Sequence, residues 1–178
     1  MSGKTLVAYA TKHGATREIA EKIGEALRQE GLQVEVESVE SIRNLDAYAA
    51  VILGSAVYIG QWRKEAIDFL ESNEAGLAKR PVWIFSSGPL GEGNPVELLK
   101  GWRFPTAQLP LVDRIRPRDI VVFHGHVNIQ QLGFIEKWML KNVKAPIGDF
   151  RNWDAIAFWA KSIAISLKKK KALWRRAA

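Results

Sequence analysis

The sequence predicts an α/β fold in which a five-stranded, doubly wound parallel sheet, in the order 2-1-3-4-5, carries helices on both faces. Short apolar runs alternate with stretches of helical periodicity, which is typical of a parallel sheet with right-handed crossovers. The second of these runs, Gln33–Ser38, alternates polar and apolar residues, so one face of the strand that it forms is expected to be exposed to solvent. This strand order places the second strand at an edge of the sheet, where a wet face is expected.

The elements are predicted from two periodicities. Apolar residues at i, i+4 and i+8, as at Ile19, Ile23 and Leu27, indicate a helix, and Gly31 is well placed to end it. Short apolar or alternating runs indicate strands. The predicted strands are Thr5–Ala10, Gln33–Ser38, Ala49–Ser55, Val82–Ser86 and Ile120–His124, and the predicted helices between them are Arg17–Glu30, Arg63–Ser72 and a short one near Thr106–Asp113.

The stretch Ser87–Asp119 fits this pattern least well, because it is rich in Gly and Pro. Long irregular loops in compact domains are usually functional. This stretch is therefore either part of a site or a place where elements are misassigned.

A late helical insertion, at about 127–150, follows the last predicted strand. Its segment Gln131–Lys144 predicts an amphipathic helix, and a final helix begins at Trp153 with Asn152 as N-cap. We expect one domain over 1–167 and a basic tail over 168–178. The predicted apolar face of the first helix is Leu132, Ile135, Met139 and Val143, with Lys137, Lys141 and Lys144 elsewhere, and the predicted core face of the second is Ile156, Trp159, Ile163 and Leu167.

The net charge of +7 is concentrated at the C-terminus. The last eleven residues hold six basic residues and no acid, so the rest of the chain carries only +1. A basic tail, Lys168–Arg176, suits an anionic membrane surface. Nucleic acid is a weaker alternative that we do not expect, and a frayed, solvated terminus is the other.

The composition excludes several classes of protein. There is no cysteine, which removes disulfides, thiolate catalysis and thiolate metal sites. No apolar run approaches the roughly 18 residues of a membrane span, and the first residues do not resemble a signal sequence. We therefore expect a cytoplasmic protein, placed at the inner face of the membrane if the tail binds lipid.

The most informative motif is the loop Thr11-Lys12-His13-Gly14-Ala15-Thr16, which lies between a predicted strand and a predicted helix. A helix N-terminus offers free backbone N–H groups and a positive dipole end to an anion. Two hydroxyls, a lysine and a glycine that lets the backbone approach closely favour a phosphate site. The simpler alternative is a tight turn in which Thr16 only caps the helix.

Other motifs carry less weight. Ser2-Gly3-Lys4-Thr5 resembles the end of a P-loop but lacks the earlier glycine, and no G-x-S-x-G elbow is present. His124-Gly-His126 lacks a nearby third ligand, so we expect no metal site there and interpret these histidines as ligand contacts or structural residues. No residue stands out as a catalytic acid or base.

The loop Thr11–Thr16 resembles the phosphate loop of the flavodoxins, commonly Ser/Thr-x-Thr-Gly-x-Thr, with His13 in place of the central threonine. A closer likeness is to the menaquinone-dependent protoporphyrinogen IX dehydrogenase family, in which such a loop runs into Thr-Arg-Glu-Ile-Ala, here Thr16–Ala20. The stretch His126–Gln130 departs from that family, because it is less basic and lacks aromatics. The likeness spans most of the chain and also rests on Val51–Ser55, Tyr58–Gly60 and Asn152-Trp153.

This resemblance implies a flavodoxin-like fold and an FMN cofactor. Tyr58 is the favoured neighbour of the flavin ring and Trp62 the weaker candidate, because aromatic side chains stack on flavins in such proteins. The FMN-binding residues that we predict are Thr11, Lys12, His13, Gly14, Ala15 and Thr16 in the first loop, Ala56, Val57 and Tyr58 in the second, and Ser86, Ser87, Gly88, Pro89 and Leu90 in the third.

Three functions remain open. The leading one is an FMN-dependent oxidoreductase resembling protoporphyrinogen IX dehydrogenase, which passes electrons to a quinone and faces an anionic membrane with Gln131–Lys144 and the basic tail. The second is a flavodoxin-type electron carrier that acts with a redox-protein partner and has no substrate of its own. The third is a flavin-free binding module.

Overall fold

Five parallel strands form the central sheet of the computed structural model, which describes residues 3–142 and 146–177. They pair in the order β2-β1-β3-β5-β6, which confirms the predicted order 2-1-3-4-5 for the five main strands. One small difference is that β4 adds a short antiparallel hairpin to the end of β3. The strands are β1 Lys4–Ala10, β2 Val34–Ser38, β3 Tyr48–Tyr58, β4 Gln61–Trp62, β5 Val82–Ser87 and β6 Asp119–Phe123.

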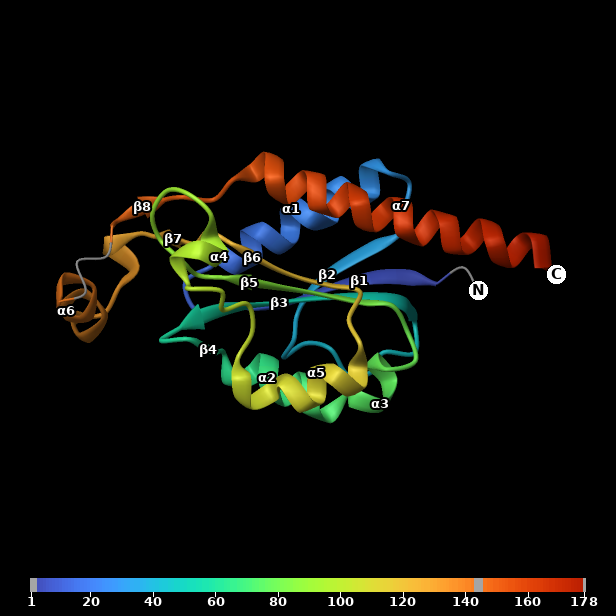
Figure 1. Cartoon of the computed structure of the whole chain (residues 1–178), viewed down its shortest axis with the longest axis horizontal. Coiled ribbons are helices and arrows are strands. Elements are labelled where there is room, and N and C mark those ends of the chain that lie inside the picture. The colour runs from blue at the N-terminus through green and yellow to red at the C-terminus, as the bar shows by residue number, and fades with distance from the viewer. Residues whose placement is uncertain (1–2, 143–145, 178) are drawn as a thin grey trace.

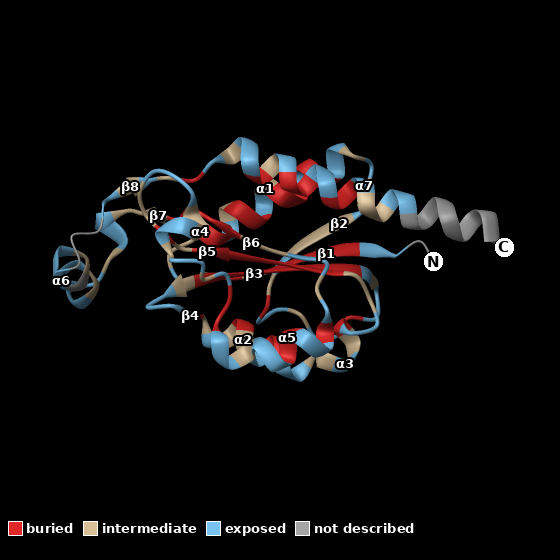
Figure 2. Ribbon diagram, viewed as in Figure 1, coloured by how far each residue is buried: buried red, intermediate tan, exposed pale blue. Residues whose placement is uncertain are grey.

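Helices cover both faces of this sheet (Figure 1). One face carries α1 and α7, and the other carries α2, α3 and α5. Figure 2 shows that the strands and the inner sides of these helices are buried. The helices are α1 Ala15–Gln29, α2 Lys64–Ser72, α3 Glu74–Leu77, α4 Pro95–Leu98, α5 Leu109–Ile115, α6 Phe134–Asn142 and α7 Trp153–Ala177, with 3₁₀ turns η1 Thr106–Gln108 and η2 Ile129–Gln131.

The alternation of side chains along the strands builds two cores. Leu53 on β3 faces α2 and α5, whereas its neighbour Ile52 faces α1 and α7. On β5, Ile84 and Phe85 divide in the same way. A strand that is buried on both faces therefore reads as a continuous apolar run, as the sequence of β3 and β5 does.

The second strand lies at the edge of the sheet, as its alternating sequence predicted. Val34 and Val36 pack against the core under α1. Glu35 turns to the other side, where it pairs with Lys4 and accepts a hydrogen bond from the Tyr48 hydroxyl at 2.5 Å. Burial and this carboxylate raise the pKa of Tyr48 to about 12.

The irregular stretch Ser87–Asp119 contains α4, η1 and α5. Asn94 caps α4 by accepting a hydrogen bond from Val96 N at 2.9 Å. The helix predicted near Thr106–Asp113 forms as η1 followed by α5 and ends two residues later, at Ile115. Phe104 and Ile115 are buried in the core, so this stretch contributes to packing as well as to the loops described below.

The late insertion consists of the strands β7 His126–Val127 and β8 Gly148–Asp149 with η2 and α6 between them. The helix predicted over Gln131–Lys144 therefore begins later, at Phe134, and is described as far as Asn142. Of its predicted apolar face, Ile135 is exposed, Leu132 precedes α6, and Val143 and the Met139 side chain lie outside the part described. Of the predicted lysines, Lys137 and Lys141 are exposed, and Lys144 also lies outside the part described. Figure 2 shows α6 almost entirely exposed, at one end of the molecule.

The final helix begins where it was predicted to begin. Asn152 Oδ1 accepts a hydrogen bond from Ala155 N at 2.9 Å, and Ile156, Trp159 and Ile163 are buried. The helix does not end at Leu167, however. α7 continues to Ala177, so the predicted boundary between domain and tail falls inside one helix, whose end projects beyond the sheet (Figure 1).

Candidate functional site

The three predicted loops meet at the carboxyl edge of the sheet. They lie at the ends of β1, β3 and β5, which are hydrogen-bonded neighbours. Both β3 and β5 run further than predicted, so that Ala56–Tyr58 form the end of β3, and Ser86 and Ser87 the end of β5. Because parallel strands all end at the same edge, residues that are far apart in sequence come together there. The late insertion lies at the same end of the molecule (Figure 1).

The first loop has the backbone geometry of an anion site. Gly14 adopts φ +89° and is the N-cap of α1, and its N–H donates to Thr11 Oγ1 at 3.0 Å. Any side chain at Gly14 would be strained at this φ. Because Gly14 is the cap and no side chain caps the helix, the alternative in which Thr16 is merely a cap is wrong.

Thr16 supplies the test of whether a phosphate fits. Its side chain is buried in the first turn of α1, and Thr16 Oγ1 has no hydrogen-bond partner among the residues that the structure describes. A buried polar group without a partner is unfavourable by about 1–3 kcal/mol, and such groups call for an explanation. A phosphate oxygen at the N-terminus of α1 would accept this bond, so the residues present fit FMN.

The two basic residues of the loop contact an acid that the sequence analysis missed. Glu136 Oε1, on α6, accepts hydrogen bonds from Lys12 Nζ at 2.5 Å and from His13 Nε2 at 2.9 Å, and Gly133 N donates to Glu136 Oε2 at 2.9 Å. These contacts, with Lys12 first, lower the pKa of Glu136 to about 2. The insertion is thereby docked on the loop. The available signal was that Glu136 is the single acid in a lysine-rich helix.

Arg151 is a second residue that the sequence analysis missed. Its buried guanidinium pairs with Asp149 at 2.7 Å and with Glu18 at 2.8 Å, and it lies 4.4 Å from the centre of the Trp153 ring. It also donates to the carbonyl of Ala15 at 3.3 Å. The guanidinium holds the pKa of Asp149 below its ordinary value. Arg151 thus ties β8 to the first turn of α1, directly behind the loop.

The second loop presents Tyr58 at the surface. Ala56 is buried, Val57 is half-buried, and Tyr58 is 40% exposed with Lys12 Nζ 5.6 Å from its ring centre. Burial, followed by the charge of Glu136, raises the pKa of Tyr58. Ile59, at φ +50°, and Gly60, at φ +70°, form the two-residue turn from β3 into β4. Ile59 is strained there and 82% exposed, beside Tyr58.

Trp62 is neither a flavin neighbour nor a surface residue. Its side chain is buried, its ring packs edge-on against Phe104 with centres 4.6 Å apart, and Nε1 donates to Ser86 Oγ at 2.9 Å. The hairpin formed by β4 turns this side chain into the core. Trp62 is therefore part of the packing under α2.

The third loop approaches the second closely. A Cβ atom at Gly88 would lie 2.9 Å from Val57 Cβ, so only glycine fits there. Ser87 and Pro89 are buried, and Leu90 is half-buried. Ser86 is different, because its hydroxyl accepts from Trp62 and donates to the carbonyl of Arg103 at 3.1 Å. The Ser86 side chain is thus committed to the core, away from the other predicted residues.

The two histidines after β6 have structural partners. His124 is buried, with Nδ1 3.2 Å from the carbonyl oxygen of Pro89 and Nε2 2.9 Å from that of Gly93. His126 Nδ1 lies 3.5 Å from the Arg151 guanidinium. His124 therefore holds the third loop in place, whereas His126 contacts Arg151.

Comparison with known proteins agrees with this geometry. Over 172 residues the chain is 22% identical to protoporphyrinogen IX dehydrogenase [quinone] of Escherichia coli strain K12, which covers 90% of this chain and 94% of that protein. It also resembles the solved structure of a flavodoxin from the domain Archaea (TM-score 0.63, 14% identity, 93% of this chain and 99% of that chain). Rubredoxin:oxygen oxidoreductase of Desulfovibrio gigas matches with TM-score 0.63 and 15% identity, over 95% of this chain and 37% of that chain.

A family model described as "Flavodoxin domain" matches residues 6–152, from the first strand to the N-cap of α7. The matched segment includes all three loops and the insertion. Together with the unpartnered Thr16 hydroxyl, it points to FMN as the cofactor. The chain therefore belongs to the flavodoxin domain family.

Proposed function

We propose that this protein is an FMN-dependent oxidoreductase resembling protoporphyrinogen IX dehydrogenase, which passes electrons from a reduced substrate to a quinone at the inner face of the membrane. The family and the distant relative support a flavin redox protein. One observation carries the finer proposal. The insertion is docked on the loop Thr11–Thr16 through Glu136, and its helix α6 exposes apolar side chains next to that loop.

In this proposal each of the three loops contacts a different part of FMN. Thr16 Oγ1 and the N-terminus of α1 bind the phosphate, and Gly88 and its neighbours line the ring with backbone. Tyr58 lies against the ring, where offset stacking contributes roughly 0.5–1.5 kcal/mol beyond burial. FMN itself supplies the redox chemistry, and the protein positions it and excludes competing reactions.

The surface of α6 suits a lipid interface that holds a quinone. Because Glu136 points inward, Phe134 and Trp138 lie on the opposite side of the helix and are 87% and 63% exposed. Lys137 and Lys141 are exposed on the same short helix. Aromatic side chains flanked by lysines favour the headgroup region of an anionic bilayer. No helix in the described part of the chain is both long and apolar enough to cross a bilayer.

The basic end of α7 requires a separate interpretation. Figure 1 places it at the end of the long axis opposite to α6. One flat membrane can contact both only if the long axis lies along its surface. We therefore propose α6 as the redox-relevant membrane contact, and contact through Lys168–Arg176 remains a prediction of its own.

A carrier without its own substrate is the second candidate, and one observation favours it. A tetrapyrrole dicarboxylate needs free cations, yet three basic residues in or directly behind the first loop already have acidic partners. Lys12 and His13 contact Glu136, and Arg151 contacts Asp149 and Glu18. Substrate binding would have to displace one of these pairs.

Anaerobic turnover with protoporphyrinogen and a menaquinone analogue in anionic vesicles tests the proposal. We expect turnover by the FMN-loaded protein, and we expect Phe134→Ser/Trp138→Ser to reduce both turnover and vesicle association while FMN content is unchanged. Phe158→Ser on α7 is the matched control, because Phe158 is 76% exposed but lies on another surface. Full flavin occupancy without porphyrinogen turnover would favour the carrier.

A further inference from the structure

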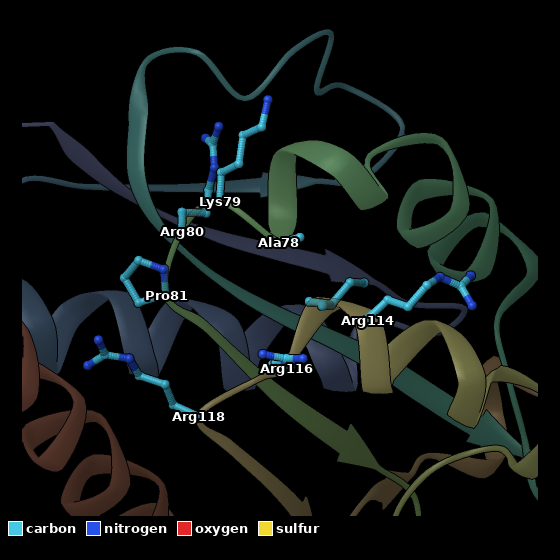
Figure 3. A pocket seen from close by; sticks show the side chains of 8 residues that line it. Ala78, Lys79, Arg80, Pro81, Arg114, Arg116 and Arg118 are labelled. Carbon is cyan, nitrogen blue, oxygen red and sulfur yellow. The ribbon is translucent and has the colours of Figure 1, made fainter.

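A second hollow in the molecule lies far from the flavin loops. It is about 320 Å³ in volume and opens at the amino edge of the sheet, where the loops that precede β5 and β6 lie side by side (Figure 3). Five of its eight lining residues are basic and none is acidic: Lys79, Arg80, Arg114, Arg116 and Arg118, with Ala78, Pro81 and Ile115. In Figure 3, Lys79 and Arg80 extend together on one side of the hollow, whereas Arg114 and Arg118 extend in opposite directions.

This concentration of charge is unusual for this chain. Residues 1–167 carry a net charge of only +1, so the remainder of that part is net negative once these five cations are set aside. The ends of α3 and α5 meet at the hollow, and a basic residue near a helix C-terminus offsets the helix dipole. That effect accounts for one or two cations, but not for five.

The five basic side chains differ in how many hydrogen bonds and ion pairs they already make. Arg114 pairs with Glu74, and Arg80 donates to the carbonyl oxygens of Gly76, Leu45 and Tyr48. In contrast, Lys79 and Arg116 have no acidic partner within residues 3–142 and 146–177.

Arg118 connects the hollow to α7. Its guanidinium lies 5.3 Å from the centre of the Trp83 ring and donates to Ser166 Oγ at 2.8 Å. Lys168 and Lys169 follow within one turn of Ser166. Arg118 therefore links the hollow to α7 just before its basic end, where Lys168 pairs with Glu30 at 2.8 Å.

Arg116 adds an independent observation. It follows the last turn of α5 with φ +55°, a left-handed conformation that favours glycine. A residue with a side chain is strained in this conformation, so glycine would make the fold more stable than arginine does. Strained residues of this kind gather at ligand sites.

We propose that this hollow binds a phosphate-bearing anion, either a lipid headgroup or a phosphate compound free in solution. Guanidinium groups match the geometry of phosphate oxygens and form charge-assisted hydrogen bonds with them. Arg116 and Lys79 supply the uncommitted charge, and Arg118 supplies the link to α7. The site is distinct from the flavin site and does not depend on the proposed function.

The test uses the full chain saturated with FMN, so that the flavin phosphate loop is filled. Pyrophosphate binding is measured by calorimetry at low salt, and association is measured with phosphatidylcholine vesicles that contain or lack phosphatidylglycerol. Arg116→Gly removes the charge and relieves the left-handed strain, so it should fold at least as well as wild type and bind about tenfold more weakly. Lys100→Gly is the matched control, because Lys100 has φ +52°, carries the same charge and lies outside the hollow.

Each arm has a defined result. Weaker anionic-vesicle association in Arg116→Gly than in Lys100→Gly identifies a headgroup, because both variants keep the α6 surface. Loss of pyrophosphate binding with unchanged vesicle association identifies a phosphate compound in solution. Either result supports the site. Equal weakening by Lys100→Gly, unchanged binding in Arg116→Gly, or failure of wild type to bind either probe would overturn it. Arg116→Asn, which tolerates the same backbone without the charge, should reproduce the loss.

Discussion

Glu136 on α6 accepts a hydrogen bond from Lys12 in the phosphate loop at 2.5 Å, although 124 residues separate them. The same carboxylate oxygen lies 2.9 Å from His13 Nε2. A single acid therefore holds the late insertion against the loop that we assign to the FMN phosphate. The position of the exposed aromatic residues on α6 depends on this contact.

Replacing Glu136 by glutamine should loosen α6 from the loop. The amide keeps the shape but loses the charge, and a partly exposed ion pair contributes up to about 1 kcal/mol. We expect amide hydrogen exchange in α6 to speed up by roughly fivefold, the factor that corresponds to this energy. Lys137→Gln changes one charge on the same helix without touching the contact, and it should leave the exchange rates unchanged. Unaltered exchange in Glu136→Gln would mean that other contacts hold the insertion.

The same contact should depend on pH in a defined window. Folding lowers the pKa of Glu136 from an ordinary value of 4.5 to about 2, so its stabilising effect is complete above 4.5 and is lost as the pH falls toward 2. The amide signal of Gly133, which donates to Glu136 Oε2, should report the transition by NMR. In Glu136→Gln that transition should be absent. A Gly133 signal that does not move in wild type would contradict the assigned contact.

Thr16→Val should change folding and FMN binding in opposite directions. Valine fills the same buried space without the unpartnered hydroxyl, so the FMN-free protein should be more stable by about 1 kcal/mol, measured by thermal unfolding. FMN affinity, measured by fluorescence quenching, should fall by about 1–3 kcal/mol, or roughly fivefold to 150-fold. Thr16→Ser keeps the hydroxyl and should keep most of the affinity. Normal affinity in the valine variant would place the phosphate elsewhere.

Trp62 and Tyr58 should behave in contrasting ways. Trp62→Phe loses the hydrogen bond to Ser86 and leaves a small cavity, so we expect a loss of roughly 1–3 kcal/mol in unfolding free energy with FMN affinity unchanged.

Tyr58→Ala should weaken FMN binding by roughly 0.5–1.5 kcal/mol, because the stacking of the ring on the flavin is lost. Its unfolding free energy should change little, because Tyr58 is surface-exposed. Denaturant titration and flavin titration of both variants separate the two roles. If Trp62→Phe is fully folded but does not bind FMN, Trp62 contacts the flavin and is not only a core residue.

Much of the fold could be predicted because its signals are local. The alternation in Val34–Ser38 marks an edge strand, and the apolar run at Val82–Ser86 marks a central one. The loop Thr11–Thr16 could be proposed as a phosphate site because a helix N-terminus with glycine and hydroxyls is a contiguous motif. Where a local signal was ambiguous, prediction failed: Trp62 follows a loop at the site, yet a two-residue turn directs it into the core.

Periodicity and capping within a few residues were enough to predict the main strands and the start of the last helix. The strand order followed because an alternating second strand belongs at an edge of a doubly wound sheet. The phosphate site at Thr11–Thr16 stays a proposal drawn from a contiguous motif.

Which charged groups contact each other could be seen only in the folded chain. Glu136 with Lys12, Arg151 with Glu18, and Arg118 with Ser166 are contacts between distant segments. The tertiary structure also placed α6 and the basic end of α7 at opposite ends of the molecule. The physical reason is that the sheet brings remote loops to one edge, so the neighbours of a charged side chain follow from strand order rather than from its own surroundings in the chain.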